Sequence, residues 1–167
     1  EKRQQRLGAA GLPAISTEFN AYVLRHSDGA VDLIDAGCGT LFGPTGGALP
    51  QRLAALDISP EQVRSLYFTH LHRDHFGGAF VAGKVAFPNA ELHLSRIEFE
   101  LWQGQESPAG EMLAAYQGKT VLFEDKEELF PGMSAWLLPG HTVGHCGFRF
   151  GDELVLVGDI LHSAALQ

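Results

Sequence analysis

One short segment constrains this chain more than any other, because three histidines and an aspartate stand together directly after an apolar run. His70, His72, Asp74 and His75 fall within six positions, and residues 66–68 before them are Leu-Tyr-Phe. A short apolar run of this kind is typical of a buried strand. Imidazole and carboxylate groups are ligands that zinc and related divalent ions accept, and their close spacing lets them converge on one small volume. The segment therefore predicts a metal site rather than a polar surface loop with incidental histidines.

Two later segments offer ligands of the same kind. Residues 139–145 (PGHTVGH) follow another apolar run, and their glycines allow the tight turn that would bring His141 inward. Residues 155–159 (VLVGD) end a third apolar run with a carboxylate, which can bridge two cations and offset their repulsion. An aspartate at a strand end is, on its own, more often a cap or a turn residue. We include Asp159 among the candidate metal ligands because both histidine segments are present.

The rest of the chain alternates strand patterns with helix patterns. Strands are expected near residues 21–24, 31–35, 66–68, 120–123, 133–138, 146–150 and 153–157, with a hairpin turn at 27–29. Helices are expected around 49–56, as a short helix that begins at Pro60 after the N-cap candidate Ser59, over 95–102 and over 107–118, the third opening with the capping-box pair Ser95 and Glu98. This order predicts an α/β fold. Since neither a repeat nor a linker divides it, we expect residues 1–167 to form a single domain.

The composition of the chain argues against several kinds of binding partner and structural class. With 45% hydrophobic and 19% charged residues and a formal net charge of -8, the chain lacks the clustered Lys and Arg that a nucleic-acid surface needs. No run approaches the roughly 20 apolar residues of a membrane span. Cys38 and Cys146 are too few for a disulfide framework. Because the first residue is Glu1 rather than Met, we expect a chain that is processed, trimmed or incompletely ordered at its start. The compartment of this soluble chain is thus left open between the cytoplasm and the periplasm or exterior.

In their order along the chain, the HxHxDH segment, the GHTxGH segment and the later Gly-Asp pair resemble the metallo-β-lactamase superfamily. The resemblance spans essentially the whole chain and implies an αβ/βα sandwich. The ligands that it implies are His70, His72 and His141 for a first metal ion, Asp74 and His75 for a second, and Asp159 as the carboxylate between them. Asp74 is also the candidate catalytic residue, which would orient the attacking water and handle its proton.

Residues 33–39, 42–45 and 87–90 more narrowly resemble the branch that contains methyl parathion hydrolase and some lactonases. The chain also departs from the family. Arg73 and Val143 stand where relatives often have proline, but neither is a ligand position. The family takes one more second-site histidine from beyond the Gly-Asp pair, and this sequence ends at Gln167. We therefore expect the C-terminal part of the fold to be missing and the second site to be one ligand short.

Several further residues have a supporting role as their simplest interpretation. Asp35 either accepts a hydrogen bond from a metal-bound histidine or caps the turn that follows it. His145 resembles a supporting residue of the family's loop more than a ligand. His162, three positions after Asp159, fits a structural role better than ligation. Cys146 is better explained as a small buried side chain than as a thiolate ligand.

Two divalent ions about 3.5 to 4 Å apart can share a water molecule, lower its pKa toward about 7 and polarise a carbonyl or phosphoryl oxygen. The sequence therefore predicts a metal-dependent hydrolase that directs a metal-activated hydroxide at an ester, lactone, amide or phosphotriester bond. Zinc is favoured for both ions, with iron and manganese as the other candidates. The expected partner is a small-molecule substrate, with no nucleic acid and no membrane; a homodimer is left open.

Three alternatives stand beside this prediction. A glyoxalase II-like thioesterase shares both histidine segments. A mononuclear iron dioxygenase of the same fold belongs to another class of chemistry. An inactive metal-binding remnant would account for the ligand that has no counterpart. Metal content and turnover separate the three.

Overall fold

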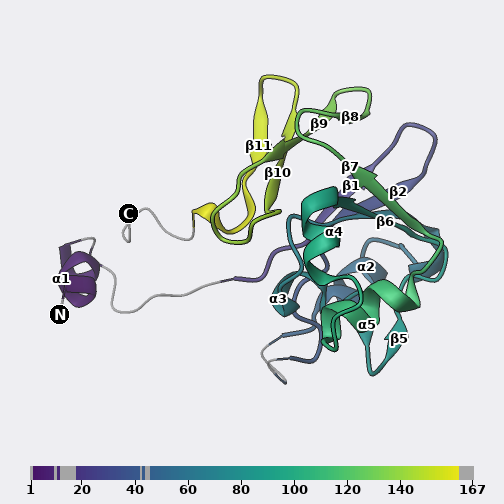
Figure 1. Cartoon of the computed structure of the whole chain (residues 1–167), viewed down its shortest axis with the longest axis horizontal. Coiled ribbons are helices and arrows are strands. Elements are labelled where there is room, and N and C mark those ends of the chain that lie inside the picture. Colours follow the sequence, from purple (N-terminus) through teal and green to yellow (C-terminus); the bar gives the residue numbers. More distant parts are fainter. Residues whose placement is uncertain (1, 10, 12–17, 42, 44–45, 162–167) are drawn as a thin grey trace.

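The computed structural model describes residues 2–9, 11, 18–41, 43 and 46–161 (Figure 1). Most of them form two sheets and the helices beside them. Of the segments singled out above, 42–45 lies mostly outside the described residues and His162 lies wholly outside them. The order of strands and helices is the α/β order that the sequence predicted.

The first sheet has five strands in the order β1-β2-β3-β6-β7. They are β1 (Tyr22–Arg25), β2 (Val31–Ile34), β3 (Val63–Tyr67), β6 (Glu91–Ser95) and β7 (Thr120–Phe123). β1 and β2 pair as an antiparallel hairpin, as the turn at residues 27–29 predicted, and β2, β3, β6 and β7 are parallel. Parallel strands have their carboxyl ends at one edge of the sheet, so the segments that follow β2 and β3 emerge side by side.

The second sheet is antiparallel, with the order β11-β10-β9-β8. Its strands are β8 (Glu128–Phe130), β9 (Met133–Leu137), β10 (Cys146–Phe150) and β11 (Leu154–Leu156). A small hairpin is formed by β4 (Phe80–Val81) and β5 (Lys84–Val85). The helices are α1 (Lys2–Ala9), α2 (Leu49–Ala54), α3 (Arg73–Phe76), α4 (Arg96–Trp102) and α5 (Pro108–Ala115), with short 3-10 turns η2 (Pro60–Gln62) and η3 (Gly158–Ile160).

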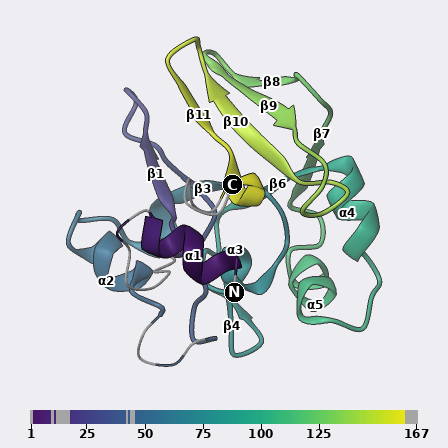
Figure 2. The same cartoon turned by 90° about the vertical axis from the view of Figure 1, so that its left-hand side faces the viewer.

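Figure 2 shows the layers: the second sheet lies over one face of the first, and α2, α3 and α5 lie on the other side. Between the first sheet and the helices, Leu33 and Leu66 pack in one apolar cluster with Leu53 and Met112. Between the two sheets, a second cluster joins residues of β2 and β3 to Ala135, Cys146 and Phe148. The end of β3 is covered on both faces, and there the sequence carries the apolar run of residues 66–68, whereas Arg64 earlier in the strand is exposed.

The sequence patterns missed helix α1 and strands β4, β5, β6 and β8, and they predicted one helix too long. The strand β6 was not predicted, because its five residues run directly into α4 and its alternation of buried Leu92 and Leu94 with polar neighbours is very short. The apolar helix face expected over residues 49–56 forms only in part. Leu53 is buried, but α2 ends at Ala54 and Leu56 is 48% exposed.

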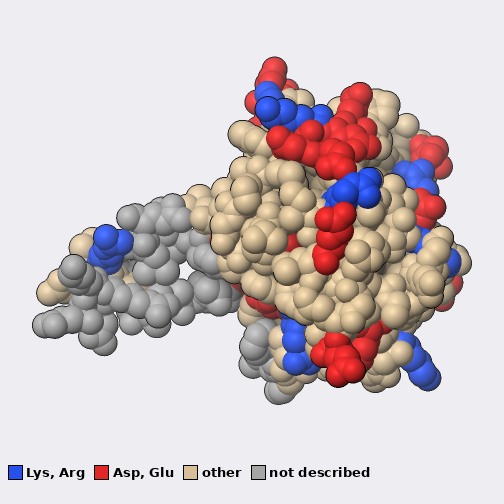
Figure 3. Space-filling model, viewed as in Figure 1, with Lys and Arg blue, Asp and Glu red and all other residues tan. Residues whose placement is uncertain are grey.

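The surface carries its charge in small patches. On the face drawn in Figure 3, Lys and Arg side chains are scattered next to Asp and Glu, and acidic side chains gather at the top of the view. No helix within the described part of the chain combines the length and the apolar character that crossing a membrane requires.

Candidate metal centre

Three segments meet where β3 ends. The first follows β3 and leads into α3, so that His70 precedes the helix and Asp74 and His75 lie within it. The second connects β9 to β10, and the third is η3 after β11. The backbone N–H of Cys146 donates to the carbonyl of Thr69 at 2.9 Å and so joins the start of β10 to the end of β3. The topology thus gathers all three segments that the sequence singled out.

The first triad consists of His70, His72 and His141. One ring nitrogen of each lies within 4.8 Å of the others. Nδ1 of His72 is 2.9 Å from Nε2 of His141, and the His70 ring lies 4.6 Å from His72 and 4.7 Å from His141, measured between centroids. These are the three residues that the family resemblance implied for a first metal ion.

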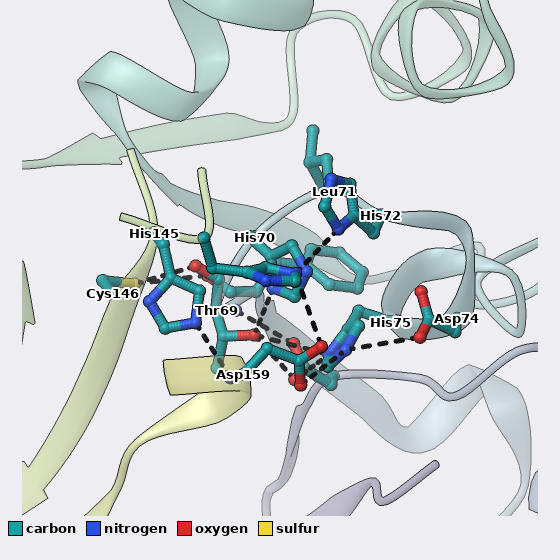
Figure 4. Close-up of polar contacts among 12 residues, drawn as sticks. Thr69, His70, Leu71, His72, Asp74, His75, His145, Cys146 and Asp159 are labelled. Carbon is teal, nitrogen blue, oxygen red and sulfur yellow. Dashed lines mark hydrogen bonds and ion pairs between the residues drawn. The ribbon is translucent and has the colours of Figure 1, made fainter. Parts of the chain in front are cut away.

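The second triad consists of His70, His75 and Asp159, again with ligand atoms within 4.8 Å of one another. Figure 4 shows Asp159 between the histidines. Its Oδ1 is 3.3 Å from Nε2 of His75, and its Oδ2 is 3.4 Å from Nε2 of His141. The two carboxylate oxygens therefore point to different triads, which is the arrangement expected of a bridging carboxylate.

Asp74 lies at the edge of this cluster. Its Oδ2 is 3.9 Å from Nε2 of His75, on the side away from Asp159 (Figure 4). The Asp74 side chain is 29% exposed and lines a cavity of about 600 Å³, together with His75 and Asp159. Asp74 thus faces solvent-accessible space, where a carboxylate can contact a substrate or a water molecule.

Hydrogen bonds to Thr69 and Asp35 fix the orientation of two histidines of the triads, His70 and His75. The backbone N–H of Thr69 donates to Asp35 Oδ1 at 2.9 Å, and its hydroxyl donates to Asp35 Oδ2 at 2.9 Å. Nδ1 of His75 is 2.8 Å from Asp35 Oδ2 and donates to it, which leaves Nε2 facing Asp159. Of the two roles left open for Asp35, the structure therefore supports the hydrogen bond to a histidine of the site.

His70 is held with a free lone pair. A hydroxyl has one proton to donate, and Thr69 gives it to Asp35, so Oγ1 accepts from Nδ1 of His70 at 3.1 Å. Nε2 of His70 then carries no proton, and it is buried without a hydrogen-bond partner among the described residues. A buried nitrogen of this kind is costly to leave unsatisfied. His70 belongs to both triads, and this lone pair could bind one metal ion.

The protonation states of His70 and His75 differ in the metal-free protein. Burial, together with the neighbouring histidines, lowers the pKa of His70 to about 2, so its ring stays neutral as a ligand must. Burial alone would lower the pKa of His75, but hydrogen bonds and charges from Asp159 and Asp35 outweigh it and raise that pKa to about 10. The surroundings of His75 therefore favour its protonated form, and a metal ion at its Nε2 would have to displace that proton.

Asp74 belongs to neither triad, and two further candidates, His145 and Cys146, also lie outside both. His145 is buried beside them, as Figure 4 shows, and contacts backbone groups. Cys146 is buried, its Sγ donates to the carbonyl of Phe68 at 3.5 Å, and burial raises its pKa well above the ordinary value. Sequence reasoning gave no role to Thr69. The sequence feature that could have indicated a role for Thr69 is its position between a buried strand and His70.

The comparisons with known proteins agree on one family. Residues 20–166 match the family model described as the metallo-beta-lactamase superfamily. The hydroxyacylglutathione hydrolase of Methylobacillus flagellatus is 28% identical over 153 residues, which are 92% of this chain and 52% of that protein. An N-acyl homoserine lactonase of Bacillus cereus is 30% identical over 93 residues, which are 56% of this chain and 35% of that protein.

A solved structure gives the same answer for the fold. The hydrolase AbOPH, described as a member of the beta lactamase superfamily, superimposes with a TM-score of 0.82 at 26% identity. The match covers 95% of this chain and 62% of that one. The present chain thus spans only part of the length of the proteins it resembles, about half in the case of the hydroxyacylglutathione hydrolase.

Proposed function

Because this chain belongs to the metallo-β-lactamase superfamily, in its fold and in the order of its histidine and aspartate segments, we propose that it is a metal-dependent hydrolase of small molecules. One observation carries the proposal. Nε2 of His70 is buried and has no hydrogen-bond partner among the described residues, and His70 belongs to both groups of potential metal ligands. Nε2 of His93 also lacks a hydrogen-bond partner in the described part of the chain, but His93 belongs to no such group there, so the proposal rests on the two properties of His70 together.

The donor set fits two divalent ions. His70, His72 and His141 would hold the first ion, Asp74 and His75 would contribute to the second, and Asp159 would lie between them. Imidazole nitrogens and carboxylate oxygens favour zinc, with iron and manganese as the other candidates. When bound, two such ions lower the pKa of water and polarise the carbonyl or phosphoryl oxygen under attack.

The side chains around the ions have separate tasks. Asp35 and Thr69 orient His75 and His70, so that each presents one nitrogen to the site. Asp74 faces the cavity, where its carboxylate can accept a hydrogen bond from the attacking water and take its proton. His75 and Asp159 also line this cavity, whose volume of about 600 Å³ suits a small-molecule substrate.

An acyl bond is the substrate class that the relatives favour. A hydroxyacylglutathione hydrolase matches most of this chain, and an N-acyl homoserine lactonase matches a little over half of it. We therefore rank lactones, esters and thioesters before amides and phosphotriesters. The thioester candidate receives separate support from the length of the match to the hydroxyacylglutathione hydrolase.

The test combines metal content with turnover. Metal-replete protein is analysed by elemental mass spectrometry and assayed with an acyl-homoserine lactone, a thioester, a phosphotriester and a β-lactam. We expect two zinc ions per chain and turnover of at least one acyl substrate. One iron ion per chain would indicate an oxygenase instead, and bound metal without turnover would indicate an inactive metal-binding protein; either result overturns the proposal.

Asp74→Ala tests the catalytic assignment. Removal of a group that orients water and moves its proton lowers turnover by about 100- to 10,000-fold. Asp152→Ala, an exposed aspartate in the turn after β10, is the matched control and should leave turnover unchanged. Undiminished turnover in Asp74→Ala would remove Asp74 from the mechanism.

A further inference from the structure

Glu98 is a buried carboxylate in the first turn of α4, and it contacts both segments that carry the first triad. We propose that Glu98 is a positioning residue, which holds the segments of His72 and His141 at the separation that the first metal ion requires. This inference rests on the function proposed above and names a residue that acts through its neighbours rather than on the metal or the substrate.

Three hydrogen bonds carry the inference. Oε1 of Glu98 accepts from the backbone N–H of Leu71 at 2.9 Å and from the indole N–H of Trp102 at 2.8 Å. Oε2 accepts from the hydroxyl of Thr142 at 2.6 Å. Leu71 lies between His70 and His72, and Thr142 directly follows His141. One carboxylate with 1% of its residue exposed thus joins the neighbours of all three ligands.

The backbone around Glu98 is in contact with the same loop. The hydroxyl of Ser95 accepts from the backbone N–H of Glu98 at 3.1 Å and donates to the carbonyl of Gly144 at 2.6 Å. A Cβ atom at Gly144 would lie 2.2 Å from the backbone nitrogen of Glu98, so only glycine fits there. The start of α4 therefore packs directly on residues 139–145 and gives Glu98 a fixed base.

This arrangement corrects the capping-box prediction. The Ser95 hydroxyl accepts from the Glu98 N–H, as expected, but the Glu98 side chain extends to Leu71, Trp102 and Thr142 instead of returning to the Ser95 backbone. A helix cap does not need those three donors. Two of the donors, Leu71 and Thr142, lie 27 and 44 residues away in the chain. Because both donate to the same carboxylate, Glu98 connects the two loops to α4.

Trp102 extends the effect to His72. The ring centroids of His72 and Trp102 are 6.4 Å apart, with the rings nearly perpendicular. Because the Trp102 indole is hydrogen-bonded to Glu98, its edge-to-face contact with His72 depends on the same carboxylate. Glu98 thus limits the movement of His72 both through the backbone of Leu71 and through the ring of Trp102.

The test compares Glu98→Gln with Glu98→Met in the full chain, with Glu100→Gln as the control on the exposed side of α4. Glutamine can accept from Leu71 and Trp102 through its oxygen and donate to the Thr142 hydroxyl through its amide, so the contacts are kept. Methionine has a similar length and keeps none of them. Zinc affinity is measured by competition with a chromophoric chelator, and the geometry of the ligands by the absorption spectrum of cobalt-loaded protein.

We expect Glu98→Met to bind zinc about 10- to 100-fold more weakly and to alter the cobalt spectrum. Glu98→Gln and Glu100→Gln should resemble wild type in both. A merely structural role would lower the melting temperature of Glu98→Met but leave zinc affinity and the cobalt spectrum unchanged, and that result overturns the inference. Equal losses in Glu98→Gln and Glu98→Met would also overturn it.

Failure of the proposed function is distinguishable, because it appears in wild type. Wild-type protein that binds no zinc or cobalt contradicts the metal site and this inference together, whereas full binding in both wild type and Glu98→Met contradicts the inference alone. If Glu98→Met does not fold, Thr142→Val and Thr142→Ser carry the test. We then expect weaker zinc binding and an altered cobalt spectrum in Thr142→Val and rescue in Thr142→Ser; wild-type behaviour in Thr142→Val overturns the inference.

Discussion

The ring of His145 holds the backbone of Asp159 in place. Its Nε2 accepts a hydrogen bond from the Asp159 N–H at 3.0 Å, while its Nδ1 donates to the carbonyl of Leu138 at 3.1 Å. These partners require a neutral ring with the proton on Nδ1, and burial, which lowers the pKa of His145, favours that neutral form. His145 therefore links the end of β9 to η3 and places the carboxylate that lies between the two triads.

His145→Ala removes this link. We expect Asp159 to lose its fixed position and zinc affinity to fall by about 10- to 100-fold, which is typical when a residue that orients a ligand is removed. Val143→Ala is the matched control, because Val143 belongs to the same loop and is 60% exposed. Chelator competition measures both variants, and wild-type zinc affinity in His145→Ala would contradict the assigned role.

Gly158 is required beside the same ring. Its φ of +55° lies in the left-handed region, and a Cβ atom there would be 2.5 Å from Nε2 of His145. Gly158→Ala should therefore combine backbone strain with a steric clash and lower the free energy of unfolding by about 2 to 4 kcal/mol.

Gly151→Ala separates the two causes. Gly151 has a similar φ of +52°, but a Cβ atom there meets nothing within 4 Å. Gly151→Ala should therefore lower the free energy of unfolding by only about 1 kcal/mol, since only the backbone conformation is disfavoured. Urea denaturation of both metal-free variants provides the comparison, and equal losses would show that the contact with His145 has no part in the effect.

His93 gives the stability a dependence on pH that is separate from the metal centre. Its ring stacks on Tyr67 at 4.4 Å, and burial lowers its pKa from the ordinary 6.5, against the opposing charges of Glu91 and Asp32; Arg64 acts in the same direction as burial. In the unfolded chain His93 takes up a proton near pH 6.5, whereas in the folded protein it takes up a proton only at lower pH. The stabilising contribution is therefore full above pH 6.5 and is lost as the pH falls from there toward the lowered pKa.

The measurement is the free energy of unfolding of wild type and His93→Gln between pH 8 and pH 5. We expect the wild type to lose more stability than His93→Gln over the acidic half of this range. Parallel pH profiles would show that His93 is protonated alike in the folded and unfolded states. The difference between the two proteins is what counts, because other histidines titrate in both.

The sequence was most informative where chemical groups are close together in the chain. His70, His72 and His75 follow one buried strand, so their convergence was predictable from spacing alone. His141 and Asp159 lie far along the chain; His141 was proposed from its place in a glycine-containing turn after an apolar run, and Asp159 because both histidine segments are present. The structure brings both beside the first segment, since β10 is joined to the end of β3.

Tertiary contacts explain what the sequence left open. Asp35 had two equal interpretations, because both a turn cap and a hydrogen bond to histidine suit an aspartate after a strand. Glu98 fits the capping-box pattern with Ser95, so the sequence offered no reason to expect its contacts with distant segments. In each case the deciding partner is tens of residues away, and only the packed fold shows which donor reaches the carboxylate.

Substitution of Asp35 can distinguish the loss of side-chain hydrogen bonds from the strain of a left-handed backbone. Asp35→Ala leaves three buried donors without an acceptor: the N–H and hydroxyl of Thr69 and Nδ1 of His75. Since an unpaired buried donor costs about 1 to 3 kcal/mol, we expect the metal-free protein to lose about 2 to 4 kcal/mol of unfolding free energy after partial relaxation. Zinc should also stabilise the variant less than wild type, because His75 and His70 are no longer oriented.

The control must reproduce the unusual backbone of Asp35, whose φ is +55°. Asp57 has a φ of +56° and is exposed, so Asp57→Ala changes the same residue type in the same conformation without removing buried contacts. We expect Asp57→Ala to lose about 1 kcal/mol and to keep the full stabilisation by zinc. If both variants lose the same stability and respond alike to zinc, left-handed strain alone accounts for Asp35→Ala, and the hydrogen bonds to Thr69 and His75 do not organise the metal centre.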